Sequence, residues 1–462
     1  MREFFLTKYS VRGIKALDQM VTLSFYKKTI SPDLDTQSYN VKGIYGANGS
    51  GKSGIVASVD ILKNLLVSTN YLNNPIVQQY LESIINKKTG ELYIECEFLC
   101  GKKNVTFLFC YQVQVTKNLT GKYVIAYEHL AYKDALKNKG WEDIFTIQDG
   151  QQPQLPKREP FAELFLPMTT NLLSSVTIDA LLFEKVRSGA IKKEDIGGSI
   201  LFLGLSLLFS FGTKLHVFLN QEDDHKTYIV KQAMEVSHTT LDLDLWMDNF
   251  VRLENDYIET ISISENIVSK AFYHRFENTV QQLYDFLHIF KDELRGIEID
   301  KKENNGVYIC DLVMQYENYN IHAEYESTGI KKLIRLYTFL REMVQGAVVF
   351  IDEFDANLHD VYLCALLEYL MEYGEGQLCF TTHNVGPMDI LKRNRKSIDF
   401  LSEDNQIHQW KTNGNYSPSK LYRKGMIEGS PFNVDSIDFI GVFDDIRGEN
   451  NGAPVDFCGG DK

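Results

Sequence analysis

The chain has 462 residues, of which 44% are hydrophobic and 24% charged, an ordinary composition for a globular protein. Its length exceeds what one compact core usually holds, so we expect a large domain that carries a second lobe. The chain has 48 lysines and arginines and 62 aspartates and glutamates, which gives a formal net charge of −14. This charge argues against nucleic-acid binding over most of the surface but leaves room for a local basic groove.

The sequence contains no segment typical of a targeting signal, a membrane span or a disulfide framework. The first residues lack the apolar core and the small-residue cleavage site of a signal peptide. The most apolar segment, 200–211, is too short to cross a bilayer and is typical of a buried helix. The seven cysteines form no C-x-x-C pair and are expected to be reduced thiols. We therefore expect a soluble, cytoplasmic protein that binds no membrane.

The first third of the chain is rich in strand patterns around one helix. The break at 149–156, with its glycine and prolines, ends this part. The apolar run 55–66 predicts a helix, and three alternating runs rich in β-branched and aromatic residues predict an antiparallel meander. The predicted strands are 21–25, 41–45, 92–98, 105–115 and 123–130.

The remainder of the chain is predicted to be helical first and then mixed. From Ile267 to Leu294 apolar residues recur every three to five positions, which indicates an amphipathic helix. After it we expect strands over 297–325, 347–351 and 378–382, and helices over 331–344 and 362–373. The end, from about residue 448, is rich in Gly and Asn and is expected to be disordered. The domains expected are an N-terminal half of a core (1–148), a helical insertion lobe (149–295), a C-terminal half of the core (296–425) and a tail (426–462).

The most specific motif lies at the end of the predicted strand 41–45. It reads G-A-N-G-S-G-K-S, a complete G-x-x-x-x-G-K-[ST] that opens an apolar helix, the context that a phosphate-binding P-loop requires. Its glycines let backbone N–H groups turn towards phosphate oxygens, and the helix N-terminus adds its positive dipole end. We expect Lys52 to reach the β- and γ-phosphates of ATP and the Ser53 hydroxyl to hold Mg²⁺. The expected nucleotide-binding residues are Gly46, Ala47, Asn48, Gly49, Ser50, Gly51, Lys52 and Ser53.

A second motif is the apolar run 347–351 followed by Asp352 and Glu353. A buried strand of a parallel sheet delivers such a carboxylate to the edge where ligands bind. Alone, this ending is common in strands that meet solvent, but together with a P-loop it predicts a hydrolytic site. We expect Asp352 to hold Mg²⁺, directly or through water, and Glu353 to orient and deprotonate the attacking water.

A third motif is the apolar strand 378–382 followed by His383 and Asn384. A single histidine at a strand end is more often structural than catalytic. A strand beside the Asp-Glu strand would, however, bring His383 to the γ-phosphate, where an imidazole can sense or stabilise that group. We therefore expect a catalytic role for His383.

A fourth motif, E-S-T-G-I-K-K at 326–332, stands just before a predicted helix. Ser327 could simply cap this helix. The order along the chain is more informative, because a P-loop is followed by Ser-x-Gly at a helix start, then by the Asp-Glu strand, and then by the histidine strand.

In this order the chain resembles the ABC-type ATPases of the SMC, RecF and OLD group. More closely, it resembles the small OLD-like AAA-type ATPases of bacterial phage-defence and abortive-infection operons. The segments that carry the resemblance span most of the chain: G-A-N-G-S-G-K-S, E-S-T-G-I-K-K, I-D-E-F-D-A-N-L-H and F-T-T-H-N. The resemblance implies an α/β fold with an ABC-type P-loop ATPase core, in which a mixed sheet is joined by an antiparallel meander, and it implies ATP and Mg²⁺ as cofactors.

The resemblance also assigns residues to a dimer interface. Ser327 and Gly329 would form the signature motif, which contacts the γ-phosphate bound by the other subunit. Asp355, with Ala356 and Asn357, would form the D-loop that crosses the interface. The signature lacks the usual LSGGQ wording, so its exact donors stay open, and the sequence places no Q-loop.

Two departures from the family pattern narrow this interpretation. Lys52 and Asp352 are 300 positions apart, and the insertion between them lacks the heptads of an SMC-type arm, so a compact helical lobe is expected. The short segment after His383 is expected to leave no room for a TOPRIM nuclease domain or a fused anticodon nuclease. The pair Asp444 and Asp445 is interpreted as a solvated surface.

The resulting hypothesis is a dimeric, nucleotide-dependent switch that hydrolyses ATP. The resemblance implies the sensor ATPase of an anti-phage system, assembled as a homodimer or higher homo-oligomer, that answers a phage trigger by controlling a separately encoded effector such as a TOPRIM-type or RloB-like nuclease. The alternatives are a RecF-like repair ATPase that clamps DNA, and, ranked last, an enzyme with its own nuclease activity.

Overall fold

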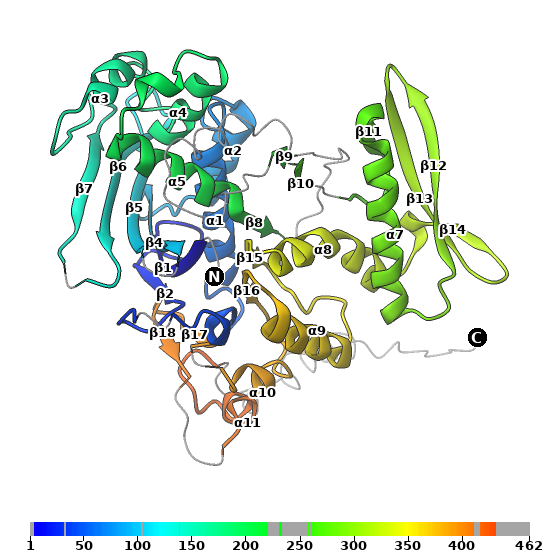
Figure 1. The fold of residues 1–462 in the computed structure, drawn as a ribbon. Coiled ribbons are helices and arrows are strands. Elements are labelled where there is room, and N and C mark those ends of the chain that lie inside the picture. Colours follow the sequence, from blue (N-terminus) through cyan, green and yellow to red (C-terminus); the bar gives the residue numbers. More distant parts are fainter. Residues whose placement is uncertain are drawn as a thin grey trace, which may run out of the picture.

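The computed structural model describes residues 4–31, 34–102, 105–137, 139–219, 231–232, 257–258, 261–394, 396–410 and 416–430. Two six-stranded sheets dominate the fold, and helices pack between them and on the outside of one of them (Figure 1). The described helices are α1 (Lys52–Val67), α2 (Pro75–Ile84), α3 (Pro160–Phe165), α4 (Ile178–Arg187), α5 (Ile200–Lys214), α7 (Tyr273–Phe290), α8 (Thr328–Val344), α9 (Asp360–Tyr373), α10 (Met388–Leu391) and α11 (Pro418–Arg423).

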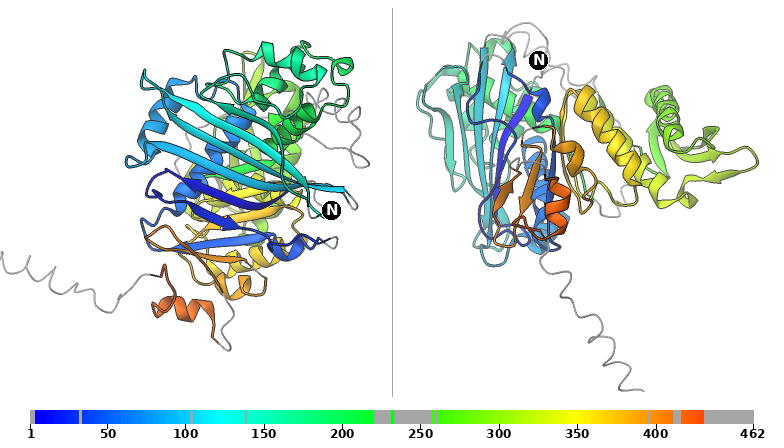
Figure 2. Two further views of the ribbon diagram at one scale, coloured as in Figure 1. Left: turned by 90° about the vertical axis from the view of Figure 1, so that its left-hand side faces the viewer. Right: turned by 90° about the horizontal axis from the view of Figure 1, so that it is seen from below.

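The first sheet is antiparallel throughout, in the order β2-β1-β4-β5-β6-β7. The predicted meander is confirmed, since its three runs lie in β4, β5 and β6, and β7 extends it by one strand that the sequence did not predict. Figure 2 shows these long strands covering one side of the molecule. Their bounds are β1 (Phe4–Arg12), β2 (Val21–Ser24), β4 (Glu91–Lys102), β5 (Val105–Lys117), β6 (Tyr123–Asp134) and β7 (Glu142–Gln148).

The second sheet has the order β18-β17-β3-β16-β15-β8, and all its pairs are parallel except β17 with β18. Its central strands are buried on both faces, as expected of a parallel sheet covered by helices. The bounds are β3 (Val41–Gly46), β8 (Leu215–Phe218), β15 (Val348–Ile351), β16 (Gln377–Thr381), β17 (Ile398–Leu401) and β18 (Ile407–Gln409).

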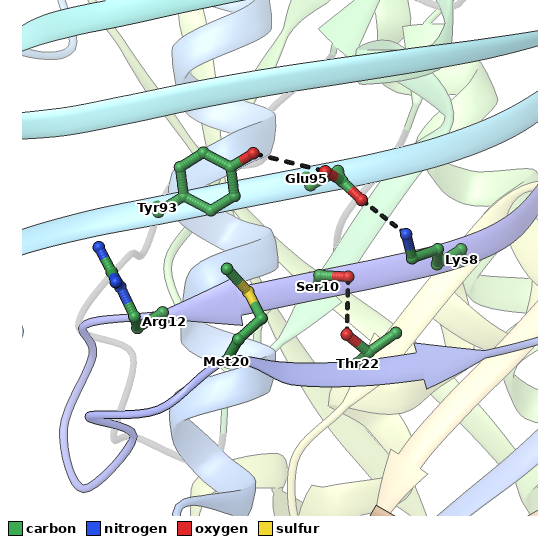
Figure 3. Close-up of a pocket in the computed structure, with 7 residues that line it drawn as sticks. All are labelled: Lys8, Ser10, Arg12, Met20, Thr22, Tyr93 and Glu95. Atoms are coloured by element: carbon green, nitrogen blue, oxygen red, sulfur yellow. Dashed lines mark hydrogen bonds and ion pairs between the residues drawn. The ribbon is translucent and has the colours of Figure 1, made fainter.

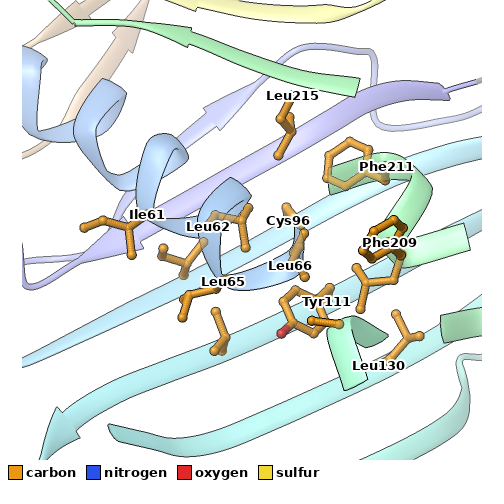
Figure 4. Close-up of a cluster of buried hydrophobic side chains, with 14 of the residues drawn as sticks. Ile61, Leu62, Leu65, Leu66, Cys96, Tyr111, Leu130, Phe209, Phe211 and Leu215 are labelled. Atoms are coloured by element: carbon orange, nitrogen blue, oxygen red, sulfur yellow. The ribbon is translucent and has the colours of Figure 1, made fainter. Parts of the chain in front are cut away.

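Alternation along β15 distributes its side chains between two cores. Val348 and Phe350 face α1 and the antiparallel sheet, whereas Val349 and Ile351 face α8, α9 and α10. The predicted helix 55–66 is confirmed as α1, which lies between the two sheets. Figure 4 shows its side chains against those of the antiparallel sheet and α5, with Ile61, Leu62, Leu65, Leu66, Cys96, Tyr111, Leu130, Phe209, Phe211 and Leu215 labelled. Each large apolar side chain buried in this way contributes about 1.5–3 kcal/mol, so α1 and the P-loop at its start are held firmly.

Residues 261–337 form a separate unit with its own core (Figures 1 and 2). One face of α7 packs on a small antiparallel sheet and on α8, through Phe276, Val280, Leu283 and Leu287. The strands are β11 (Asn266–Ser269), β12 (Gly296–Asn304), β13 (Val307–Gln315) and β14 (Asn320–His322), and the short pair β9 (Lys231–Gln232) and β10 (Tyr257–Ile258) precedes them.

The single helical lobe predicted for 149–295 is wrong. Helices α3, α4 and α5 join the main core, and β8 pairs with β15 inside the parallel sheet. Only the later part, from β11 onwards, belongs to the separate unit, and that unit continues through β14 beyond the predicted boundary. The amphipathic helix also starts later than predicted, because Ile267 lies in β11 and is 39% exposed.

Several other expectations meet the structure directly. The buried helix predicted at 200–211 is confirmed as α5, and the strand and helix predictions after residue 296 are confirmed as β12 to β16 and α8 and α9. The described part of the chain contains no helix that is both long and apolar enough to cross a membrane. The six cysteines within it are free thiols. Cys458, most of the predicted tail and the pair Asp444–Asp445 lie outside the described residues.

Candidate functional site

The P-loop joins β3 to α1 at the carboxyl edge of the parallel sheet. The strand and the helix that the motif requires are both present. Gly51, the residue before α1, has φ 104°, and a Cβ there would lie 2.3 Å from Leu17 Cδ2. Only glycine fits this combination of positive φ and close approach. The loop therefore depends on a residue from the β1–β2 connection as well as on its own glycines.

The ammonium group of Lys52 lies inside the loop. Its Nζ donates hydrogen bonds of 2.9 Å to the carbonyl oxygens of Gly46 and Ala47, and the side chain is buried. Burial lowers the pKa of Lys52 to about 8, against the opposing effect of Asp352, Glu353 and other nearby carboxylates. A cation held in a partly desolvated cradle is suited to an anionic ligand.

Strand β15 brings Asp352 and Glu353 to the same edge. The Asp352 N–H donates to Phe218 O at 2.9 Å, and its Oδ1 accepts a 2.6 Å hydrogen bond from the Thr381 hydroxyl. The same hydroxyl oxygen accepts a 2.8 Å hydrogen bond from the Glu353 N–H. One threonine on the neighbouring strand β16 thus fixes both carboxylate residues.

Glu353 adopts a backbone conformation that non-glycine residues seldom take, with φ 48°. Such a conformation costs on the order of 1–3 kcal/mol and persists only where the surroundings impose it. Here Thr381 holds the turn through the Glu353 N–H bond, and the Phe354 N–H donates to Thr381 O at 3.0 Å. Thr381 therefore fixes the backbone of the turn that carries Glu353.

His383 follows β16 and is exposed at the same edge. Burial of part of the ring lowers the pKa of His383, and the Lys52 ammonium lowers it further, while Asp355, Glu353 and Asp352 oppose the shift. This shift favours the neutral imidazole, which can donate one hydrogen bond. Strands β3, β16 and β15 are parallel neighbours, so their carboxyl ends bring the P-loop with Lys52, His383 and the three carboxylates to one edge of the sheet.

The predicted signature segment lies at the start of α8, against the predicted D-loop. Ser327 is exposed and caps the helix, its Oγ accepting from the Ile330 N–H at 3.4 Å. Gly329 packs so closely on the turn after β15 that a Cβ would lie 2.8 Å from Asn357 O. Asn357 itself has φ 63°. The Ser-x-Gly segment therefore contacts the predicted D-loop of its own chain and presents Ser327 to solvent.

Glu326, just before this segment, is buried and tied to the separate unit. Its carboxylate accepts hydrogen bonds from the Tyr316 hydroxyl, from Lys291 Nζ at 3.2 Å and from the Ser327 N–H at 3.1 Å. The Tyr316 hydroxyl, the Ser327 N–H and Lys291 keep the pKa of Glu326 below its usual range despite burial. The signature segment is thereby fixed to β13 and to the end of α7.

The donor set suits a magnesium–triphosphate group. Ser50 Oγ is buried in the loop with no hydrogen-bond partner within the described residues. The Ser53 hydroxyl in the first turn of α1 and the Asp352 carboxylate offer oxygen ligands, which Mg²⁺ prefers. The P-loop glycines leave room for backbone N–H groups to approach phosphate oxygens. The residues present therefore fit both expected cofactors.

Thr381 is the functional residue that sequence reasoning missed. The two threonines of F-T-T-H-N could have pointed to it. The sequence does not reveal, however, that β16 pairs with β15 in the register that places Thr381 beside Asp352. Leu401 of β17, whose carbonyl lies against Gly46, was missed for the same reason.

A pocket of about 380 Å³ lies elsewhere, on the outer face of the antiparallel sheet (Figure 3). Its polar groups pair with one another: Lys8 with Glu95 at 2.7 Å, and Ser10 with Thr22 at 3.0 Å. Lys8 also forms ion pairs with both carboxylates of the one cluster in the described chain that could hold a metal ion, formed by Glu95, Glu97 and Cys110. Because these groups pair with one another, we place the candidate functional site at the P-loop, at the carboxyl edge of the parallel sheet.

Comparison with protein families gives one match. Residues 205–389, less than half of the chain, match the family described as “AAA domain, putative AbiEii toxin, Type IV TA system”. The matched stretch contains the Ser-x-Gly helix α8, the Asp-Glu strand β15 and the histidine strand β16, whereas the P-loop lies before it. A comparison with curated proteins finds no match. The family match supports an AAA-type P-loop ATPase domain in this chain, in agreement with the α/β architecture.

Proposed function

We propose that this chain is an ABC-type ATPase of the OLD-like group, which hydrolyses ATP between two copies of itself and uses the nucleotide state as a switch. The observation that carries the proposal is the convergence of Lys52, Asp352, Glu353 and His383 at the carboxyl ends of the neighbouring parallel strands β3, β15 and β16. The family match supports it, because it covers three of these four residues together with the Ser-x-Gly helix.

Each residue has a distinct task in the proposed reaction. Lys52 and the loop N–H groups would bind the β- and γ-phosphates, and Ser53 and Asp352 would hold Mg²⁺, which neutralises charge on the phosphate oxygens. Glu353, aimed by its left-handed turn, would orient the attacking water and take its proton. The neutral His383 would donate a hydrogen bond to the γ-phosphate as charge develops there.

The second half of the site would come from another copy of the chain. Ser327 is exposed at the N-terminus of α8, and a helix N-terminus with a free hydroxyl is a suitable donor for a phosphate oxygen. The D-loop residue Asp355 would cross the same interface. Because the two half-sites would meet only around a bound nucleotide, ATP binding would close the dimer and hydrolysis would allow it to open.

The switch would serve an anti-phage system. The description of the matched family names a toxin and a toxin–antitoxin system, which supports a defence setting in which this chain senses a phage trigger. Its net charge of −14 favours a protein partner over nucleic acid. We propose a separately encoded effector, such as a TOPRIM-type or RloB-like nuclease, as that partner.

The substitution Glu353→Gln tests this function. It should bind ATP and Mg²⁺ but stall hydrolysis, so ATP should convert the chain to a stable dimer, measured by light scattering. Glu184→Gln, which makes the same change at an exposed position of α4, serves as the control and should leave hydrolysis unchanged. A Glu353→Gln chain that stays monomeric at saturating ATP would contradict the composite site, and ATP-dependent retention on duplex DNA would favour the RecF-like clamp instead.

A further inference from the structure

Lys332, in the second turn of α8, is a buried lysine beside the carboxylates of the candidate site. It belongs to the buried face of the helix, and only 5% of the residue is exposed. Its Nζ donates a 3.1 Å hydrogen bond to Glu353 O and lies 4.8 Å from the centre of the Phe218 ring. Withdrawing an ammonium group from water costs several kcal/mol unless other groups compensate, so the position needs an explanation.

Lys332 contacts the turn that follows β15 and the strand beside it. Glu353 O is its hydrogen-bond acceptor, and Phe218, which supports the ammonium through its ring, accepts the N–H of Asp352 through its carbonyl. The negative charges of Glu353, Asp355 and Asp352 all act on the ammonium. One lysine thus contacts Glu353, the residue after Asp352, and Phe218, whose carbonyl accepts the Asp352 N–H.

The same helix makes a second contact with this turn one helical turn earlier. Gly329 lies against Asn357 O, at a distance that leaves no room for a Cβ. The segment that carries Ser327 and the turn that carries Glu353 are therefore joined at two points by backbone and side-chain contacts. A displacement of the helix start cannot leave the Glu353 turn unmoved, because closely packed elements shift together.

We propose that Lys332 is a positioning residue that transmits the position of the signature helix to Glu353 of the same chain. This inference rests on the proposed function, in which Ser327 binds the nucleotide held by the other subunit. When Ser327 engages that nucleotide, α8 is fixed, and Lys332 sets the turn from which Glu353 acts on its own nucleotide. Occupation of one site would then accelerate hydrolysis at the other.

The test compares Lys332→Met with wild type and with Arg341→Met, which removes a similar long cation nine residues further along α8. Lys332→Met should lower kcat by about 10- to 100-fold, the usual cost of misplacing a catalytic group, with the KM for ATP changed less than about threefold. It should also abolish any sigmoidal dependence of the rate on ATP. Lys332→Arg, which keeps a donor and a charge, should retain much of the rate, and Arg341→Met should behave as wild type.

The outcomes separate the two proposals. A wild-type chain without ATP hydrolysis would overturn the proposed function and this inference together. An active wild type with an equally active Lys332→Met would overturn the inference alone, as would a parallel loss of nucleotide binding measured with a fluorescent ATP analogue. If Lys332→Met melts well below wild type, Lys332→Gln decides the matter by the same two criteria.

Discussion

Two carboxylic acids lie buried together between the meander and α4, and they offer a quantitative test of the structure. Glu128 of β6 and Asp179 of α4 are both 0% exposed, and among the described residues no cation pairs with either. Glu128 accepts hydrogen bonds from the Tyr111 hydroxyl at 3.1 Å and from the Ile178 N–H at 3.4 Å. Burial raises the pKa of Asp179 to about 8 and, helped by the nearby Asp179, raises the pKa of Glu128 well above its usual range.

The sign of the effect follows from these raised values. A carboxyl group whose pKa is higher in the folded state binds a proton that the unfolded chain has already lost above about pH 4. The free energy of unfolding should therefore fall as pH rises from about 4 to about 8, by about 1.4 kcal/mol per pH unit for Asp179, and level off above the folded pKa. At pH 7 the cost of Asp179 reaches an upper limit of about 4 kcal/mol.

The substitution Asp179→Asn keeps the shape of the side chain and removes this cost. We expect it to raise the melting temperature at pH 8 by several degrees, with a gain that shrinks towards pH 5. The assay is thermal unfolding in matched buffers between pH 5 and pH 9. The control is Asp292→Asn, at an exposed position after α7, which should change the melting temperature little at any pH. A lower melting temperature for Asp179→Asn at every pH, or a gain that does not vary with pH, would refute the reasoning.

Three further predictions concern the site and its support. Thr381→Val keeps the shape of the side chain but removes its hydrogen bonds to Asp352 and Glu353. We therefore expect kcat to fall by about 10- to 100-fold with little change in melting temperature. An unchanged kcat would contradict the role assigned to this hydroxyl. Lys42→Met should lower the free energy of unfolding, measured by denaturant titration, by about 3–5 kcal/mol. The reason is that the buried Asp399, 2.8 Å from Lys42 Nζ, loses its partner. A loss below about 1 kcal/mol would show that the pair is not buried as described. In the absence of nucleotide, Gly51→Ala should lower the melting temperature more than Gly49→Ala does. Both glycines have positive φ, but only a Cβ at position 51 would meet a neighbouring side chain. Equal effects of the two substitutions would argue against the observed loop.

The sequence predicts best where the chemistry is local. The P-loop and the Asp-Glu strand are contiguous motifs, and the structure places the first between β3 and α1 and the second at the end of β15. Thr381 could not be identified, because its role arises from the register between β15 and β16. Long-range pairing of this kind leaves no mark in a single sequence.

The insertion shows the same limit at the level of domains. The four-residue strand β8 follows directly on the long apolar helix α5, and no change of period separates the two in the sequence. Its pairing with β15 is what moves α5 from a supposed lobe into the main core. The helix prediction was sound, but its place in the fold depended on a strand too short to recognise.

The most direct test of the central claim mixes two inactive chains. Lys52→Ala removes the P-loop cation and leaves the signature, whereas Ser327→Arg blocks the signature and leaves the P-loop. If two copies build each site, an equal mixture should recover up to about one quarter of the wild-type ATPase rate, because half of the dimers contain one intact site of two. A mixture no more active than its components, from variants that both fold and associate, would contradict a site shared between two copies of the chain.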